Sequence, residues 1–424
     1  MKPIRSFFLL VCAVSGVVLV GMDVPCAYAW TDENPASASQ CAAADVNDVG
    51  TVVENCKVSN ASVPFVTVGG ATTQLAALPA TAGSVPCSVN MINNAAQGQE
   101  TVVGACRDAN NVFQAVSWNS GSPGSPTQLM PFSGLLGIIG GGVRTGATGV
   151  NVQGVVIGES VDGNGSGLPV YWAPNSGAAT PLNVPLLAPQ ANCVPADIND
   201  AQTPSVVGNC PAGGGGGGKN VAVFWPTLGA AYAAFPVPGG ASYCNVSRIN
   251  IHNQILGECI YGTDTHRAVV WGPGGTGPTV LLTVNGGQAL RTRGADLSDA
   301  DLSDAGLVAV NFLAGSGQAG FYEPALWNPA TSNASSITLP GGAIHGTVRC
   351  IGSNGKAVGN FETAAGDIHP FHVEPGSLTA IDDGSPAGGP NAVATACSIG
   401  GINEVITGES SSSEDKQVEK QLIP

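Results

Sequence analysis

Positive charge is scarce in this chain, with 14 Lys and Arg residues against 29 Asp and Glu in 424 residues. An acidic surface repels phosphate backbones and anionic lipids, so nucleic-acid binding is not expected. Long runs with helical spacing of apolar residues are also missing. The chain instead carries 60 Gly and 30 Pro, with short runs of Val, Ile, Leu and Ala between turn signals. This composition predicts an all-β protein.

Local catalytic motifs are absent as well. The sequence has no Gly-x-Ser-x-Gly elbow and no His-Glu-x-x-His helix, and its five histidines are scattered. Distant loops can still assemble a catalytic set, so the sequence leaves catalysis open but favours a non-catalytic protein. Glu323, Asp264, Arg267 and His266, polar residues near expected strand ends, would be the first to mutate.

The N-terminus has the pattern of an export signal. A basic start, with Lys2 and Arg5, precedes an apolar run from Phe7 to Met22 and a small-residue cleavage site at residues 27–29. The alternative is a membrane anchor, but the run is shorter than the ~20 residues that a spanning helix needs. We therefore expect a signal peptide over residues 1–29 and a secreted or periplasmic mature protein, with no transmembrane segment. Its loss leaves 12 basic and 28 acidic residues.

Ten of the 12 cysteines follow the signal, and eight of them flank four copies of one turn. Residues equidistant from a hairpin turn face each other about 4.5–5.5 Å apart, within reach of a disulfide. The predicted bonds within hairpins are Cys41–Cys56, Cys87–Cys106, Cys193–Cys210 and Cys244–Cys259. Cys350 and Cys397 remain, and the simplest hypothesis joins them between neighbouring repeats. Such bonds need an oxidising compartment.

An internal repeat of about 50 residues organises the chain. Its second strand carries Val-Val-Gly or a variant, and a third strand ends near a Trp in five units. The glycines are Gly104, Gly158, Gly208, Gly257, Gly359 and Gly408, and the tryptophans are Trp118, Trp172, Trp225, Trp271 and Trp327. A ring of tryptophans that binds a ligand is conceivable, but one large aromatic per unit favours core packing between sheets.

Four short strands per repeat indicate a β-propeller, because a single small sheet cannot bury both of its faces alone. Seven full units run from about residue 41 to residue 390, and a hairpin remains at 391–410. Seven blades with a spare hairpin and eight blades with one truncated both fit. An open β-repeat array or a solenoid is the alternative. We take residues 30–408 as the repeat domain and expect a disordered polar tail over 409–424.

The units resemble those of the HAF-repeat family of exported bacterial proteins. The similarity lies in turns such as Val46-Asn47-Asp48-Val49-Gly50 and Ile198-Asn199-Asp200-Ala201, in Ser303-Asp304-Ala305-Gly306, and in the strand Arg267-Ala268-Val269-Val270-Trp271. It covers nearly the whole mature chain, but each motif is short, and the His of the naming tripeptide is mostly missing. The resemblance implies an extracellular repeat protein, and it transfers no activity and no catalytic residues to this chain.

Two tandem copies of Ala-Asp-Leu-Ser-Asp place four carboxylates close together: Asp296, Asp299, Asp301 and Asp304. Clustered carboxylate oxygens suit Ca²⁺, but a complete calcium-binding loop is missing. The simpler interpretation is a local duplication that lengthens a hairpin in the sixth unit. No cofactor is expected otherwise.

The function that these observations favour is a non-catalytic binding or surface-interaction module, with an extracellular glycan or protein as its partner. A secreted enzyme that acts on extracellular glycans is the alternative, and a structural envelope protein is the second alternative. Two or three carboxylates converging at one channel mouth, with raised pKa values, would favour the enzyme.

Overall fold

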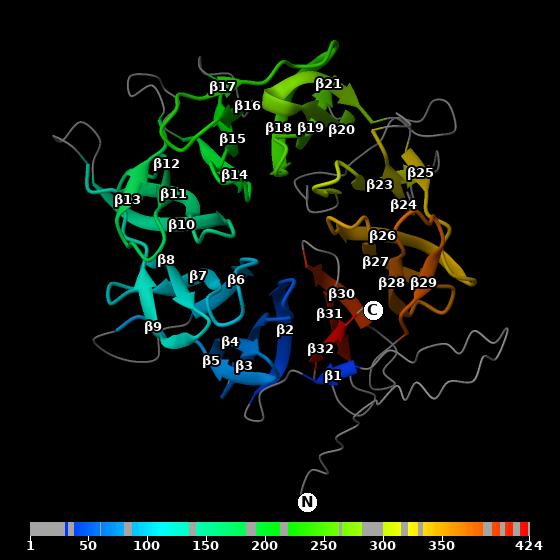
Figure 1. Ribbon diagram of the computed structural model, residues 1–424, viewed down its shortest axis with the longest axis horizontal. Coiled ribbons are helices and arrows are strands. Elements are labelled where there is room, and N and C mark those ends of the chain that lie inside the picture. Colours follow the sequence, from blue (N-terminus) through cyan, green and yellow to red (C-terminus); the bar gives the residue numbers. More distant parts are fainter. Residues whose placement is uncertain are drawn as a thin grey trace, which may run out of the picture.

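The computed structural model describes residues 30–32, 38–59, 61–79, 87–134, 141–183, 192–212, 219–262, 265–281, 300–314, 321–329, 334–384, 392–398, 403–409 and 416–422. In this part of the chain, 32 strands form eight four-stranded antiparallel sheets and one short 3-10 helix, η1 (Pro273–Gly275), is present. The sheets surround a central axis as the blades of a propeller (Figure 1). This confirms the predicted fold class.

Seven blades each consist of four strands that follow one another in the sequence, ordered from the axis outward. Blade 1 has β2 (Ser39–Val46), β3 (Val52–Val58), β4 (Ala61–Val68) and β5 (Ala71–Gln74). Blade 2 has β6 (Cys87–Ile92), β7 (Thr101–Arg107), β8 (Phe113–Asn119) and β9 (Ser122–Gln128). Blade 3 has β10 (Gly142–Val150), β11 (Val156–Asp162), β12 (Gly167–Trp172) and β13 (Ala179–Pro181). Blade 4 has β14 (Val194–Ile198), β15 (Val206–Pro211), β16 (Asn220–Trp225) and β17 (Ala233–Ala234).

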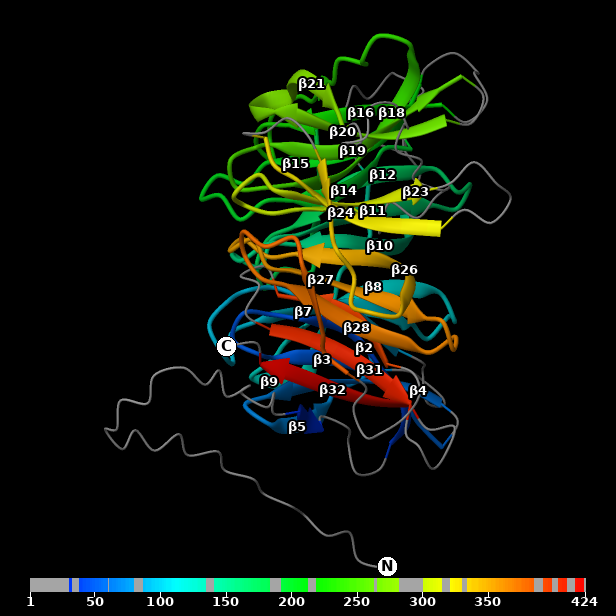
Figure 2. The same ribbon diagram turned by 90° about the vertical axis from the view of Figure 1, so that its right-hand side faces the viewer.

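The next three blades repeat this order. Blade 5 has β18 (Ala241–Ile249), β19 (Ile255–Tyr261), β20 (Thr265–Gly272) and β21 (Thr276–Val280). Blade 6 has β22 (Ala300–Leu302), β23 (Val308–Ala314), β24 (Phe321–Trp327) and β25 (Ala334–Ser336). Blade 7 has β26 (Ala343–Ile351), β27 (Ala357–Thr363), β28 (Ile368–Val373) and β29 (Ala380–Asp382). In the side view the sheets of neighbouring blades lie one above another (Figure 2).

The eighth blade combines the two ends of the described chain. It contains β30 (Ala392–Cys397), β31 (Asn403–Glu409) and β32 (Lys416–Leu422), and its outer strand is β1 (Trp30–Asp32), which pairs with β32. The disordered tail that we predicted over 409–424 is therefore wrong for 416–422, because pairing with β31 and β1 satisfies the backbone of that segment. The predicted signal peptide, residues 1–29, lies outside the described residues.

The recurring glycine of the second strand has a steric cause. A Cβ atom on Gly257 would lie 2.1 Å from the carbonyl oxygen of Asn245 in the inner strand, and one on Gly104 would lie 2.0 Å from the oxygen of Ser88. The inner strand is bulged close to both places, between Val246 and Arg248 and between Val89 and Met91. Glycine thus allows the two backbones to approach where the bulge brings them together.

The tryptophans belong to the core. Trp118, Trp172, Trp225 and Trp271 are at most 1% exposed, and Trp327 is 4% exposed. The indole N–H of Trp271 donates to the carbonyl oxygen of Pro236 at 3.0 Å, and the other three fully buried indoles donate to carbonyls of preceding links in the same way. The core interpretation is confirmed, and a ligand-binding ring of these tryptophans is excluded.

A ladder of turn side chains joins successive blades. The side-chain amide of Asn47 donates to the carbonyl oxygen of Asn93 at 3.1 Å. Asn93 donates to Asn151, Asn151 to Asn199, Asn199 to Asn250 and Asn250 to Ser303, each at a carbonyl oxygen of the following blade. All five asparagines are buried. The repeated turn asparagine therefore fixes the spacing between neighbouring blades.

All five predicted disulfides are present. Four join the inner strand, or the residue just before it, to the second strand of the same blade. The fifth, Cys350–Cys397, joins blade 7 to blade 8. Among the described residues, no helix is long and apolar enough to cross a membrane.

Candidate functional site

The inner strands of the blades surround a cavity of about 450 Å³ on the propeller axis. Residues from all eight blades line it, near the turns that lead from each inner strand to the second strand. Every repeat contributes to one concave space with both polar and apolar lining residues, which makes this channel mouth the candidate site.

The next-to-last residue of each inner strand in blades 1–7 lines the cavity. We call this set the channel ring: Asp45, Met91, Gly149, Asp197, Arg248, Asp301 and Cys350. A β-bulge immediately precedes this position in six of the seven inner strands, and β22 is the exception. Bulges turn a side chain away from the regular alternation of a strand, which fits their recurrence here.

The three ring aspartates make the same contacts in different blades. Asp197 accepts the backbone N–H of Ile198 at 2.9 Å in its own blade and that of Ile249 at 2.9 Å in the next blade. Asp45 bridges blades 1 and 2 through Val46 and Ile92, and Asp301 bridges blades 6 and 7 through Leu302 and Ile351. Each carboxylate is thus a link between blades as well as a wall of the channel.

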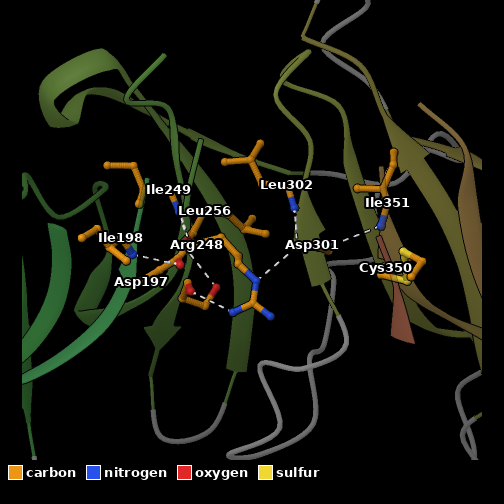
Figure 3. A network of polar contacts seen from close by, with 11 residues as sticks. Asp197, Ile198, Arg248, Ile249, Leu256, Asp301, Leu302, Cys350 and Ile351 are labelled. Carbon is orange, nitrogen blue, oxygen red and sulfur yellow. Dashed lines mark hydrogen bonds and ion pairs between the residues drawn. A yellow bond between two sulfur atoms is a disulfide. The ribbon is translucent and has the colours of Figure 1, made fainter. Parts of the chain in front are cut away.

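Arg248 is the ring's one cation and extends toward Asp301 (Figure 3). Its Nε donates to Asp301 Oδ1 at 3.2 Å, and one terminal nitrogen donates to the carbonyl oxygen of Ser247. Its side chain is 46% exposed, whereas that of Asp301 is 19% exposed. Partial loss of solvent in the channel opposes the charge of Arg248, but the carboxylates of Asp301, Asp197 and Asp45 raise its pKa, so the guanidinium stays charged.

The surrounding protein makes two ring carboxyls, those of Asp45 and Asp197, hard to ionise. Loss of solvent raises the pKa of Asp45 to about 7, although the N–H groups of Ile92 and Val46 oppose the shift. Loss of solvent also raises the pKa of Asp197 to about 6, against the attraction of Arg248. In the turn between β14 and β15, loss of solvent raises the pKa of Asp200, and the charges of neighbouring acids raise it further. Protonated and ionised carboxyls therefore coexist in the channel near neutral pH.

Stability is expected to depend on pH through Asp45. Its folded pKa of about 7 lies above its ordinary value of 3.8, so the folded state binds the proton more tightly. The stabilisation is complete below about pH 4 and is lost as the pH rises through about 7. As the pH rises from about 4 to about 7, we expect the free energy of unfolding of wild type to fall relative to that of Asp45→Asn. The slope against pH should correspond to about one proton bound by the folded state and not by the unfolded state. Urea titrations at several pH values would measure it, and parallel curves for the two proteins would contradict it.

The predicted calcium residues separate in the structure. Asp296 and Asp299 lie outside the described residues. Asp301 belongs to the channel ring, while Asp304 lines the cavity from the next turn and accepts the N–H of Ile251 at 3.2 Å. The copy at 300–304 is the inner strand of blade 6 and its turn. The copy at 295–299 lies outside the described residues, so a local duplication in this hairpin stays a prediction. Within the described part of the chain, these acids form no group of three with ligand atoms near enough to share one ion.

Among the described residues, the polar ones near strand ends that the sequence suggested as first targets for mutation do not line the cavity. Arg267 stacks over the Tyr261 ring at 4.5 Å, and His266 pairs with Glu258, both between β19 and β20. Glu323 is exposed in β24, and Asp264 lies outside the described residues. The structure does not bring them together at the channel mouth.

The channel ring was not predicted from the sequence, although a signal for it was present. In units 1, 4 and 6, an Asp lies two positions before the Asn or Ser of the turn, and a second Asp directly follows that Asn or Ser. Asp45-Val46-Asn47-Asp48, Asp197-Ile198-Asn199-Asp200 and Asp301-Leu302-Ser303-Asp304 share this pattern. The first Asp of each copy lies in the ring.

A second polar cluster, in blade 7, is closed to solvent. His372 Nδ1 lies 2.6 Å from Asp383 Oδ1, and both side chains are 0% exposed. Burial raises the pKa of Asp383, against the hydrogen bond from His372. A ligand cannot reach this pair in the folded state, which leaves the channel as the accessible candidate.

Comparisons with known proteins show the fold alone. No family model matches the chain, and no curated protein matches it. Among solved structures, a prolyl endopeptidase aligns with a TM-score of 0.54 and 10% identity, over 90% of this chain and 54% of that one. The propeller of Dos1 aligns with a TM-score of 0.50 and 8% identity, over 92% and 94%. A puromycin-hydrolysing peptidase of Mycobacterium tuberculosis is 14% identical over 81% of this chain, with a TM-score of 0.45. The chain spans about half the length of these two peptidases, and its identity to all three proteins is very low.

Proposed function

We propose that this protein is an exported binding module that holds a small, hydroxyl-rich ligand, such as the end of a glycan, in the mouth of its central channel. The observation that carries the proposal is the cavity of about 450 Å³ that residues of all eight blades line. Export is supported by the five disulfides. Membership of the HAF-repeat family stays a prediction from the sequence.

The chemistry of the channel wall supports a ligand with hydroxyl groups. A hydroxyl both donates and accepts hydrogen bonds, and it therefore fits a wall that offers both kinds of group side by side. Arg248 supplies donors from a half-exposed guanidinium, and the carboxylates of Asp197 and Asp301 supply acceptors on either side of it (Figure 3). Ligand pockets commonly use a few such convergent polar groups for specificity.

A binding screen tests this function. The purified, oxidised protein would be titrated with a panel of neutral mono- and disaccharides by calorimetry. We expect at least one sugar to bind, and Arg248→Met to weaken it by about tenfold or more, since a charged hydrogen bond is worth about 1.5–3 kcal/mol. Arg248→Lys, which keeps the charge but loses the planar fork, should weaken binding less.

The matched control is Arg107→Met, because Arg107 stacks over Phe113 at 4.0 Å in blade 2 and does not line the cavity. Equal weakening by this variant would contradict a channel site. Binding of cationic amines without any sugar would contradict a hydroxyl-rich ligand, and so would a panel in which nothing binds.

Glycan hydrolysis is the second candidate, and the raised pKa values of Asp45 and Asp197 favour it. A general acid needs a carboxyl that is protonated near neutral pH. Both carboxyls, however, also bridge blades through two backbone N–H groups, and this structural role accounts for their burial. Analysis for new reducing ends after incubation with the bound sugar polymer separates the candidates, since a binding module releases none.

A further inference from the structure

One of the five disulfides differs from the others in its surroundings. The eight cysteines of the intra-blade bonds are at most 4% exposed. Cys350 and Cys397 are only partly buried, and both line the channel cavity. Their Cα atoms are 6.2 Å apart, against 4.0–4.1 Å in the four hairpin bonds. The position of Cys350 in the channel ring explains this exposure.

The location makes the fifth bond reachable from solvent. Cys350 occupies the ring position that Arg248 and Asp301 occupy in blades 5 and 6, and Figure 3 shows it beyond Asp301. A small molecule that enters the cavity therefore reaches Cys350 and Cys397 while the protein stays folded. Attack on the four buried bonds requires a hairpin to open first.

We propose that Cys350–Cys397 is a thiol–disulfide exchange site that reacts with small dithiols entering the channel. A thiolate of the incoming dithiol attacks one sulfur, the S–S bond breaks, and a mixed disulfide forms. The second thiol of the reagent then attacks the mixed disulfide, so that the reagent leaves as a cyclic disulfide. Two electrons pass to the protein, and Cys350 and Cys397 become thiols. The inference is independent of the ligand that the channel binds.

Exchange at this site removes the covalent link between blades 7 and 8. Cys350–Cys397 is the one disulfide between blades in the described part of the chain, and it spans 47 residues, against 15–19 for the others. Asn360 makes two further links to blade 8, because its side chain donates to and accepts from the backbone of Ala394. Only three residue pairs join β1 to β32. Reduction therefore removes a covalent tie at the blade that both chain ends share.

Timed reduction of the native protein tests the proposal. The oxidised protein would be incubated with dithiothreitol without denaturant, quenched with iodoacetamide at intervals and mapped by mass spectrometry. We expect Cys350 and Cys397 to be alkylated at least about tenfold faster than any other cysteine, since exchange rates follow access. Trypsin should then cut the segments of blade 8 faster in the reduced protein than in the oxidised one.

Two variants make the result decisive. The pair Cys350→Ser and Cys397→Ser should abolish the fast phase of labelling, whereas the pair Cys244→Ser and Cys259→Ser should retain it. Equal rates for all five bonds would overturn the proposal. Reduction of Cys350–Cys397 only at urea concentrations that unfold the protein would overturn it as well. Both outcomes can be seen by labelling the wild-type protein, without either variant.

Discussion

Replacement of Trp271 by alanine is expected to lower the free energy of unfolding by about 3–5 kcal/mol. The indole is 0% exposed and stacks on Phe235, with ring centroids 5.4 Å apart. Its removal leaves a cavity at the interface of blades 4 and 5, and it also removes the donor to the carbonyl of Pro236. Urea denaturation followed by circular dichroism would measure the loss.

The aromatic control for this variant is Phe113→Ala. Phe113 is 47% exposed in β8, so truncation of its ring should cost less than about 1 kcal/mol. Trp271→Phe should fall between the two, because it fills most of the cavity but cannot donate to Pro236. A loss at Trp271→Ala no greater than that at Phe113→Ala would mean that the indole does not hold these blades together.

The repeat architecture could be predicted because local chemistry recurs in most of the blades. Opposed cysteines in four blades, the turn asparagine and the tryptophan of five units are set by contacts within a blade or with its neighbour. Such short-range rules need no knowledge of the whole ring. Cys350 was paired with Cys397 by elimination, since the other eight cysteines left one pair.

The number of blades could not be predicted, because the last blade depends on pairing between the two ends. β1 has three residues and no repeat motif, and β32, Lys416–Leu422, is rich in Lys, Glu and Gln. Polar composition of this kind is typical of a disordered segment, and strand propensity alone would not reverse that interpretation. Pairing with β31 and β1 supplies the stabilisation, and the pairing with β1 forms only when the two ends meet.

The channel ring escaped prediction for a related reason. Asp45, Asp197 and Asp301 are far apart in the sequence, and only rotation about the axis brings their blades around one cavity. Their shared position before the turn was visible in the sequence. In β2 and β14, however, the direction of the side chain depends on a bulge in the strand. The regular alternation of inward and outward side chains along a strand does not predict where a bulge occurs.

Replacement of Asn93 by alanine is expected to cost about 2–4 kcal/mol, the largest loss that we expect at any polar residue. Its side-chain amide donates to the carbonyl oxygen of Asn151 at 2.8 Å, and its Oδ1 accepts the backbone N–H of Thr101 at 2.8 Å. The side chain is 3% exposed, so water cannot replace either bond. Each partner left without a hydrogen bond costs about 1–3 kcal/mol.

The position of Asn93 in the ladder makes this loss a test of how the blades are spaced. Asn110→Ala is the matched control, because Asn110 is exposed in a turn of the same blade and should change stability by no more than about 0.5 kcal/mol. Asn93→Asp keeps the acceptor for Thr101 but loses the donor to Asn151, and it should cost more than the control. Hydrogen exchange should rise at Thr101 and along the Asn151 turn in Asn93→Ala. Unchanged exchange at both places, with stability equal to that of Asn110→Ala, would show that the ladder does not set the distance between blades 2 and 3.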